Sequence, residues 1–219
     1  MFLLRGLIAG ERTAIDVGAN WGCYTYYLSK FCRRVEAFEP IPSCAESISA
    51  FRGPNIRVHA VALSSVSGWR ELHIPSHRGV PASGHATFNE LVGPAEAIVV
   101  PVRTLDEYQF TDVSLLKVDV EGHELEVLQG ASRTIDRERP VILVEVEQRH
   151  ISVPIATVFR YITDYGYRGF FWRHGRLWPI AEFASEIHQS TPGSHSLIDR
   201  KEYVNNFIFT TRPLRVGPP

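Results

Sequence analysis

The stretch TAIDVGANWG, at residues 13–22, decides the fold. Its first five residues form a short apolar run that stops at a glycine, which is the pattern of a buried β-strand ending in a turn. Residues 22–31 then have the pattern of a helix. Strand, glycine turn and helix in this order are typical of a doubly wound α/β sheet, in which ligands bind beyond the carboxyl ends of the strands.

The rest of the chain repeats this alternation, which favours a parallel sheet covered by helices. We expect further strands at 35–38, 56–63, 113–120, 141–146, 167–172 and 207–211, and helices at 43–51, 123–135 and 155–162. Residues 64–102 break the rhythm, since two expected strands flank a polar stretch rich in Gly, Pro, Ser and His. We interpret this segment as a flap inserted into a single domain that spans 1–219.

Composition excludes several classes of protein. The 219 residues are 44% hydrophobic and 21% charged with a net charge of −1, so the chain is neither disordered nor basic enough to hold nucleic acid or an anionic membrane globally. No apolar run approaches the roughly 20 residues of a membrane span. The apolar residues 1–10 are expected to form a helix on the core rather than a signal peptide. Three cysteines without zinc spacing fit a reducing cytoplasm.

The glycine turn differs from a dinucleotide fingerprint. Asn20 stands where that fingerprint has its middle glycine, between Gly18 and Gly22. Asp16, two residues before the first glycine, would repel a phosphate and accept an ammonium group. The turn therefore favours a zwitterionic ligand such as S-adenosylmethionine over NAD. Glu39 ends the second expected strand, 21 residues after Gly18, where a carboxylate can accept the ribose hydroxyls of a nucleoside.

The stretch LLKVDVEGHE, at residues 115–124, carries a second group of polar residues. Alternation along the strand places Lys117 and Asp119 on one side, with Asp119 beside the ligand crevice. Glu121 and His123 follow in the turn. Two carboxylates and an imidazole there can orient an alcohol and take its proton, although His123 is equally interpreted as a capping or surface residue.

Glu145, within VILVEVE, is a further candidate. A carboxylate inside an apolar strand is unfavourable unless it is paired or lies at the edge of the sheet. We favour a position beside the crevice. A structural salt bridge with an arginine is the alternative.

Together these motifs resemble the FkbM family of S-adenosylmethionine-dependent methyltransferases. The matching pieces occur in family order and are AIDVGANWGCYTYYLS, VEAFEPIP, VRTLDE, LLKVDVEGHELEVLQGA, VILVEVE and NNFIFTT. The resemblance implies a class I methyltransferase fold, with a seven-stranded sheet whose last strand is antiparallel. It also implies O-methylation, commonly of a hydroxyl on a sugar or a polyketide-derived molecule.

The resemblance also implies roles for residues. The loop around the methionine part of the cofactor corresponds to Asp16, Gly18, Asn20 and Gly22. Glu39 corresponds to the ribose ligand, and Asp119 lies near the methyl donor and the acceptor. The flap occupies the acceptor side, where the expected substrate-binding residues are Ser83 and His85, together with Glu121.

We therefore expect a cytoplasmic O-methyltransferase with a small-molecule or glycan acceptor and with Asp119, His123 or Glu145 as the base. Mg²⁺ held by Asp119, Glu121 or Glu145 is a less favoured addition. A nicotinamide-dependent oxidoreductase and a non-catalytic binding scaffold are the alternatives, while nucleic-acid methylation lacks both a basic stripe and its sequence signature. The sequence leaves open the acceptor and whether the chain forms a homo-oligomer.

Overall fold

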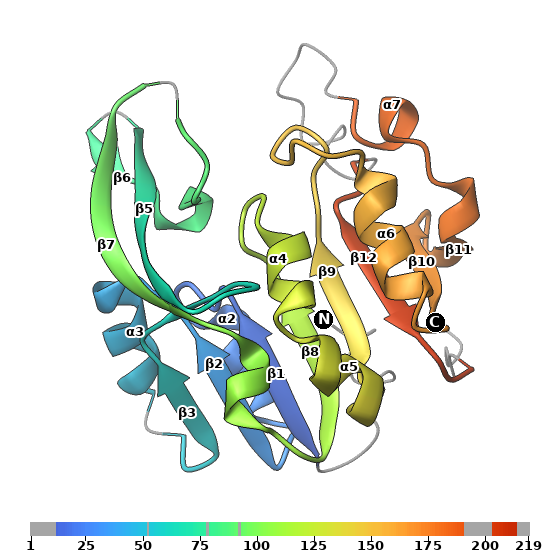
Figure 1. Ribbon diagram of the computed structural model, residues 1–219, viewed down its shortest axis with the longest axis horizontal. Coiled ribbons are helices and arrows are strands. Elements are labelled where there is room, and N and C mark those ends of the chain that lie inside the picture. The colour runs from blue at the N-terminus through green and yellow to red at the C-terminus, as the bar shows by residue number, and fades with distance from the viewer. Residues whose placement is uncertain (1–11, 52, 78, 92, 191–202, 214–219) are drawn as a thin grey trace.

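The computed structural model describes residues 12–51, 53–77, 79–91, 93–190 and 203–213. Its main element is a mixed eight-stranded sheet in the order β11-β10-β12-β9-β8-β1-β2-β3 (Figure 1). Its parallel strands are β1 (Thr13–Val17), β2 (Arg34–Phe38), β3 (Ile56–His59), β8 (Val113–Val118) and β9 (Val141–Glu145). Antiparallel pairs at one side join β12 (Asn206–Thr210), β10 (Arg168–Arg173) and β11 (Arg176–Pro179).

This arrangement confirms the predicted doubly wound sheet, because the last strand, β12, lies antiparallel between β9 and β10. The eighth strand, β11, is added to the seven predicted. It pairs with β10 across a two-residue turn in which His174 and Gly175 have φ values of 50° and 75°. Two positive φ values are typical of the type I′ turn, whose twist matches that of the paired strands.

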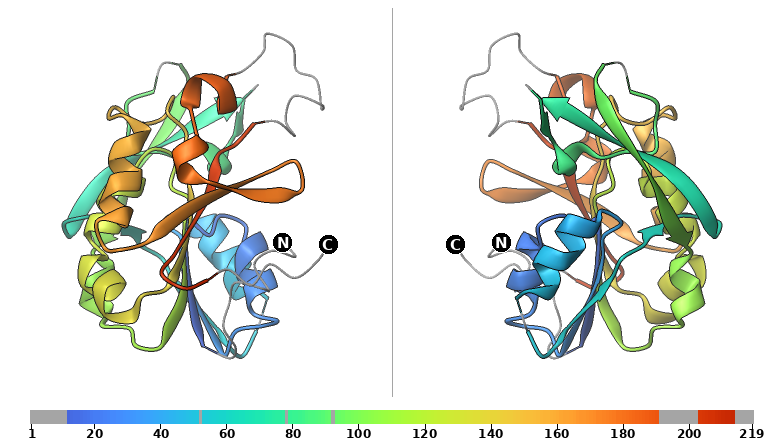
Figure 2. Two further views of the ribbon diagram at one scale, coloured as in Figure 1. Left: turned by 90° about the vertical axis from the view of Figure 1, so that its right-hand side faces the viewer. Right: turned by 90° about the vertical axis from the view of Figure 1, so that its left-hand side faces the viewer.

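Helices cover both faces of the sheet (Figure 2), namely α2 (Cys23–Leu28) and α3 (Pro42–Ser49) on one face and α4 (Glu124–Gln129), α5 (Ser132–Glu138) and α6 (Ile155–Thr163) on the other. Successive side chains of β1 point to opposite faces of the sheet, so β1 contributes to the hydrophobic core on each face. Ile15 and Val17 belong to the larger cluster with α4 and α6, whereas Ala14 packs with Leu28 of α2. Asp16 shares the α2 face, where its carboxylate binds a helix side chain.

Two predicted elements are divided in the structure. The helix expected over 123–135 becomes α4 and α5, which meet near Gly130; a Cβ there would lie 2.0 Å from the carbonyl oxygen of Ser64. The strand expected over 56–63 becomes β3 and β4 (Ala62–Leu63), and β4 joins a different sheet. The helix expected over 1–10 falls outside the described residues. Within the described part of the chain, no helix has the length and apolar character needed to cross a membrane.

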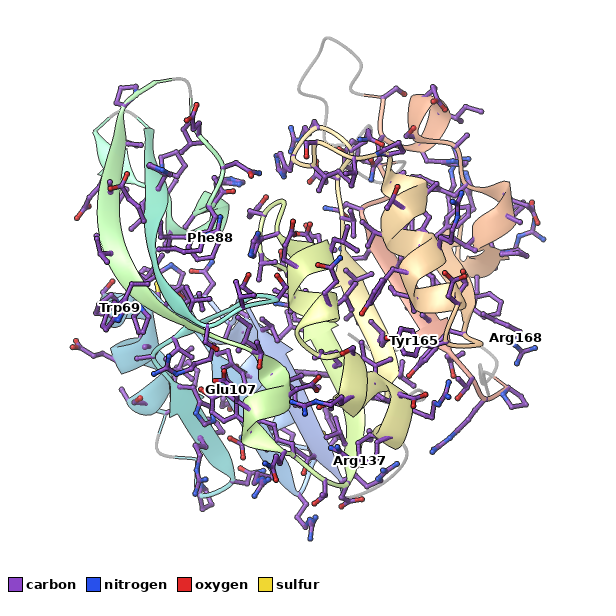
Figure 3. The ribbon with its side chains drawn as sticks, in the orientation of Figure 1. Trp69, Phe88, Glu107, Arg137, Tyr165 and Arg168 are labelled. Atoms are coloured by element: carbon purple, nitrogen blue, oxygen red, sulfur yellow. The ribbon has the colours of Figure 1, made fainter. Side chains whose placement is uncertain are left out.

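The flap is a second sheet of order β4-β7-β5-β6. Its long ribbon pairs β5 (Gly68–His77) with β7 (Ala95–Arg103), and β6 (Val80–Pro81) extends it. Leu72 and Val100 pack against Ile41 at the start of α3, so the inner face is apolar and anchored. Trp69 lies on the outer side, whereas Phe88 lies on the side toward α4 (Figure 3). The short helices are η1 (Ser83–His85), η2 (Leu105–Tyr108), η3 (Ile180–Glu182) and α7 (Ser185–His188).

The chain leaves β1 toward β2 on one side and returns to β8 on the other, which makes the β1–β8 boundary a topological switch point. Gly18 follows β1 with a φ of 72°. A Cβ on Gly18 would lie 1.8 Å from the carbonyl oxygen of Asp119, which follows β8. The glycine therefore permits both the left-handed turn and the close approach of two backbones at this point.

We predict that Gly18→Ala destabilises the protein by at least about 2 kcal/mol more than Gly175→Ala. Both glycines have nearly the same positive φ, 72° and 75°, so both substitutions carry the left-handed cost of roughly 1–2 kcal/mol. Only Gly18 has a neighbour that a Cβ would meet, because the space around Gly175 is open for 4 Å. Urea unfolding of both variants measures the difference, and equal losses would contradict the packing argument.

Candidate functional site

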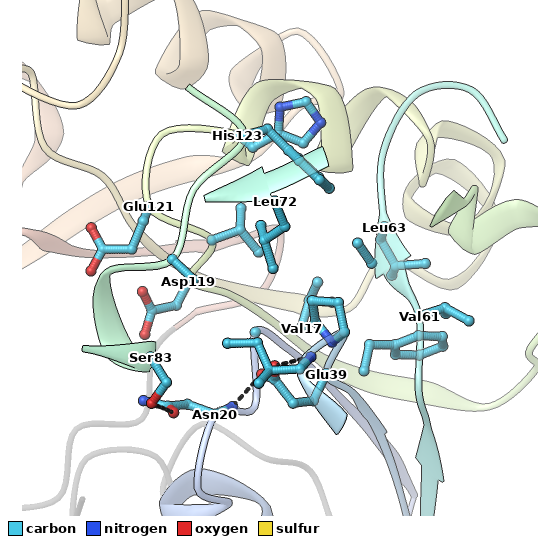
Figure 4. Close-up of a pocket in the computed structure, with 18 of the residues that line it drawn as sticks. Val17, Asn20, Glu39, Val61, Leu63, Leu72, Ser83, Asp119, Glu121 and His123 are labelled. Atoms are coloured by element: carbon cyan, nitrogen blue, oxygen red, sulfur yellow. Dashed lines mark hydrogen bonds between the residues drawn. The ribbon is translucent and has the colours of Figure 1, made fainter. Parts of the chain in front are cut away.

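A cavity of about 630 Å³, counted to its open mouth, lies at the switch point (Figure 4). The carboxyl ends of β1, β2 and β8 form one side, and the flap forms the other. The residues that line it are Val17, Gly18, Asn20, Phe38, Glu39, Pro40, Ile41, Val61, Ala62, Leu63, Leu72, Ser83, Gly84, Ala86, Phe88, Asp119, Val120, Glu121 and His123. The predicted cofactor residues Gly18, Asn20, Glu39 and Asp119 are thus brought together.

Glu39 is the buried carboxylate at the β2 end of the cavity. Its two oxygens accept the backbone N–H groups of Asn20 and Ile41, at 2.7 and 2.8 Å. Burial raises the pKa of Glu39, and the two backbone hydrogen bonds act against that rise. A carboxylate oxygen accepts more than one hydrogen bond, so Glu39 is held in place while retaining capacity for hydroxyl donors.

Lys117 joins the ends of β1 and β8. Its Nζ lies 3.2 Å from Asp16 Oδ1 and 3.3 Å from Asp119 Oδ2, and it donates a 3.0 Å hydrogen bond to the carbonyl oxygen of Gly18. Strand register explains the meeting, because Asp16 and Lys117 are direct partners across β1 and β8. Burial lowers the pKa of Lys117, but the two carboxylates outweigh it and leave the pKa above its ordinary value. Lys117 is therefore charged.

Asp16 lies behind the cavity rather than in its lining. Its carboxylate is fully buried, pairs with Lys117 and accepts a 2.6 Å hydrogen bond from Thr25 Oγ1 of α2. The expected contact with a ligand ammonium group is thus corrected, because a residue of β1 with this parity faces α2. Gly22 also lies outside the lining; its φ is 82°, and Ile48 and Phe51 pack within 3 Å of where a Cβ would stand.

Asp119 and Glu145 are close enough to repel each other, but only Asp119 lines the cavity. Asp119 lines the cavity with its side chain 27% exposed, and burial raises its pKa against the opposing effect of Lys117. Glu145 is absent from the described lining. Its oxygens accept the amide N–H groups of Asn205 and Asn206 at 2.6 and 3.0 Å, and burial together with Asp119 raises its pKa to about 7. The two asparagines belong to the NNFIFTT motif, whose role the sequence did not indicate.

His123 lines the cavity with its acceptor nitrogen already engaged. Nε2 lies 2.9 Å from Ser64 Oγ and 3.3 Å from an Arg70 nitrogen of the flap. Burial and the Arg70 charge lower the pKa of His123 to about 4, so the imidazole is neutral at pH 7. Since arginine only donates, Nε2 must accept from it. This arrangement favours a structural role for His123 over that of a free base.

Glu121 ties the flap to two loops beside the cavity. Its Oε1 lies 3.2 Å from His85 Nδ1 in the flap, and its Oε2 lies 2.8 Å from His150 Nδ1 after β9. Thr87 donates to the Glu121 carbonyl oxygen at 2.7 Å. Also from the flap, Ser83 Oγ donates to Asn20 Oδ1 at 3.0 Å. Of the three residues expected on the acceptor side, Ser83 and Glu121 line the cavity and His85 does not, and all three hold the flap against the neighbouring loops.

His150 is a site residue without a sequence signal. It follows the acid-ended strand VILVEVE by three residues, and no spacing pattern marks it. Within the described chain, no group of three or more His, Cys, Asp or Glu side chains is arranged to hold a metal ion.

We predict that Glu121→Gln lowers the pKa of His150 and removes a pH-dependent part of the stability. The hydrogen bond to Glu121 raises the pKa of His150 above its ordinary value, although burial opposes it. The stabilisation is complete below the unfolded pKa of about 6.5 and is lost as pH rises through the folded pKa. The variant should therefore lose about 1 kcal/mol at pH 6 and less at pH 9, as measured by denaturant unfolding.

Glu126→Gln is the matched control, because Glu126 lies 3.5 Å from His123, an imidazole that is neutral across this range. NMR titration of the histidines gives the pKa directly. An unchanged His150 pKa in Glu121→Gln would show that the contact carries no charge interaction.

The fold and the cavity define the class. A doubly wound sheet with an antiparallel strand beside β9, and a cavity at its switch point, is the class I methyltransferase architecture. Residues 16–168 match the methyltransferase FkbM domain, so the chain belongs to the FkbM methyltransferase family. This match confirms the resemblance drawn from the motifs.

The chain is similar to two known methyltransferases. The methyltransferase sdnD of Sordaria araneosa is 30% identical over 53% of this chain and 59% of that protein. The crystal structure of the FkbM methyltransferase from Methylobacillus flagellatus KT superposes with a TM-score of 0.58 at 18% identity, over 91% of this chain and 43% of that chain. This chain thus spans less than two thirds of the length of either relative, and the second comparison shows the fold alone.

Proposed function

We propose that the protein transfers a methyl group from S-adenosylmethionine to a hydroxyl of a small-molecule or glycan acceptor, such as a sugar or a polyketide. The observation that carries the proposal is Glu39, a buried carboxylate that faces the cavity at the end of β2 with both oxygens fixed by backbone N–H groups. Its position beyond the second strand is the one from which a carboxylate accepts ribose hydroxyls in doubly wound folds.

The residues present fit this cofactor. Phe38, Val61 and Leu63 supply an apolar side for an adenine ring next to Glu39. Gly18 and Asn20 supply the close backbone approach beside β1, and Asp119 supplies an acidic group at the β8 side. An anionic pyrophosphate beside the glycine turn would instead meet the Asp119 carboxylate, with no lysine or arginine among the described lining residues to compensate it, which disfavours NAD and the oxidoreductase alternative.

When bound, S-adenosylmethionine supplies an electrophilic methyl group on a sulfonium. This chain's residues then have two tasks, to align the acceptor oxygen with that group and to receive its proton. Asp119 is the first candidate for the second task, because it lines the cavity, whereas Glu145 is not among the lining residues and the acceptor nitrogen of His123 is already engaged. We assign acceptor contact to Ser83 and Glu121, because both line the cavity where it meets the flap.

We predict that S-adenosylhomocysteine binds with micromolar affinity, that NAD does not bind, and that Glu39→Gln weakens S-adenosylhomocysteine binding by about 1.5–3 kcal/mol. Glutamine replaces one acceptor oxygen with an amide that faces a backbone donor. Calorimetry gives both affinities. Glu46→Gln, at an exposed site on α3, is the control and should leave binding unchanged. NAD binding without S-adenosylhomocysteine binding would refute the cofactor assignment.

Turnover tests the reaction itself. Labelled S-adenosylmethionine should transfer its methyl group to an acceptor within a panel of sugars, polyketides and small phenols. Asp119→Asn should lower the rate by roughly 10²-fold or more if Asp119 receives the proton. Cofactor binding without transfer to any hydroxyl, despite turnover on an amine panel, would refute O-methylation. Cofactor binding without any turnover would favour the scaffold alternative.

A further inference from the structure

The charges of Asp16, Lys117 and Asp119 do not balance. Asp16 and Asp119 share the single ammonium group of Lys117, so these three side chains carry one net negative charge. Asp16 is fully buried on the α2 side, whereas the Asp119 side chain is 27% exposed and lines the cavity. The excess charge therefore reaches the cavity through Asp119.

Neighbouring groups do not supply the missing positive charge. Glu145, beside Asp119 at the end of β9, is held by the neutral amides of Asn205 and Asn206 and adds a further acid. Glu121 adds another, shared between two imidazoles. The Tyr24 ring stacks 5.0 Å from Lys117 Nζ without bringing charge. No lysine or arginine occurs among the described residues that line the cavity.

A partly desolvated carboxylate without a full counter-ion favours a cationic ligand. We propose that Asp119 makes the cavity selective for the positive sulfonium of S-adenosylmethionine over the neutral thioether of its demethylated product. This inference rests on the proposed function and adds to it a means of distinguishing the cofactor from its product by charge. When the methyl carbon bonds to the acceptor oxygen, the S–CH₃ bond breaks, its electron pair stays on sulfur, and the acceptor proton leaves to a base. The charge that Asp119 attracts is thereby removed, which favours product release.

The cofactor contains a second cation, the α-ammonium group, which the product retains. Glu39 and Asp119 follow β2 and β8, which flank β1 at one strand spacing of about 4.8 Å on each side. In the cofactor, one methylene separates the ribose from the sulfur, and three more carbons separate the sulfur from the ammonium. With the ribose at Glu39, the sulfur follows after one methylene, within the two strand spacings that separate the ends of β2 and β8, whereas the ammonium lies three carbons beyond it; Asp119 is therefore assigned to the sulfonium.

The test is calorimetry with three probes, namely S-adenosylmethionine, S-adenosylhomocysteine and sinefungin, which carries an ammonium group in place of the sulfonium methyl. The wild-type protein should bind the two probes that are cationic at this position more tightly than S-adenosylhomocysteine. Asp119→Asn should weaken both by about tenfold or more and change S-adenosylhomocysteine binding less than threefold. Asp119→Glu, which keeps the charge, should restore the preference.

Glu39→Gln is the matched control, because the ribose is common to all three probes and their affinities should fall by the same factor. Equal weakening of all three probes in Asp119→Asn would place Asp119 at the α-ammonium and overturn the inference while leaving the proposed function intact. Equal binding of sinefungin and S-adenosylhomocysteine by the wild-type protein would also overturn the inference, and this comparison needs no variant. Wild-type protein that binds none of the probes would overturn both.

Discussion

The site depends on one buried ammonium group. Lys117 Nζ contacts Asp16 on β1, Asp119 after β8 and the carbonyl oxygen of Gly18 between them. Removing one partner of such a buried set typically costs 3–5 kcal/mol, because the remaining charges lose their compensation. The same contacts fix the glycine turn against the end of β8, at the point where Gly18 has no room for a side chain. The floor of the cavity is therefore set by electrostatics and backbone packing together.

The opposite side of the cavity is set by the flap, which is held by an apolar anchor and by several polar contacts. Leu72 and Val100 anchor its inner face on α3, and Glu121 and Asn20 bind its short helix η1 through His85 and Ser83. The His85–Glu121 pair is solvent-exposed, and an exposed ion pair contributes about 0–1 kcal/mol. This pair is therefore the easiest of these contacts to break when a ligand enters.

Most of the fold could be predicted from the sequence, since apolar runs, glycine turns and helical spacing each report a local preference. The identity of the cavity residues Gly18, Asn20, Glu39 and Asp119 also followed, because each ends a strand or lies in the turn after it. The sequence did not predict which way some side chains point or which hydrogen-bond partners they have. Asp16 faces α2 because of its parity on β1, and the His123 nitrogen is occupied by Ser64 and Arg70, which lie more than fifty residues away. His150 meets Glu121 only through the loop after β9, a contact that no spacing encodes.

The acids at the ends of β8 and β9, Asp119 and Glu145, affect the stability of the protein without ligand. Burial raises the pKa of Asp119, and it raises that of Glu145 to about 7, so the folded chain binds more protons than the unfolded chain between the ordinary carboxyl pKa and neutrality. Stability from these groups accordingly falls as pH rises through that interval. A cation placed beside Asp119 reverses the effect, because it stabilises the ionised carboxylate in the folded state. The raised pKa of Asp119 and the preference for a positively charged ligand therefore have the same physical origin, a carboxylate that is desolvated and only partly paired.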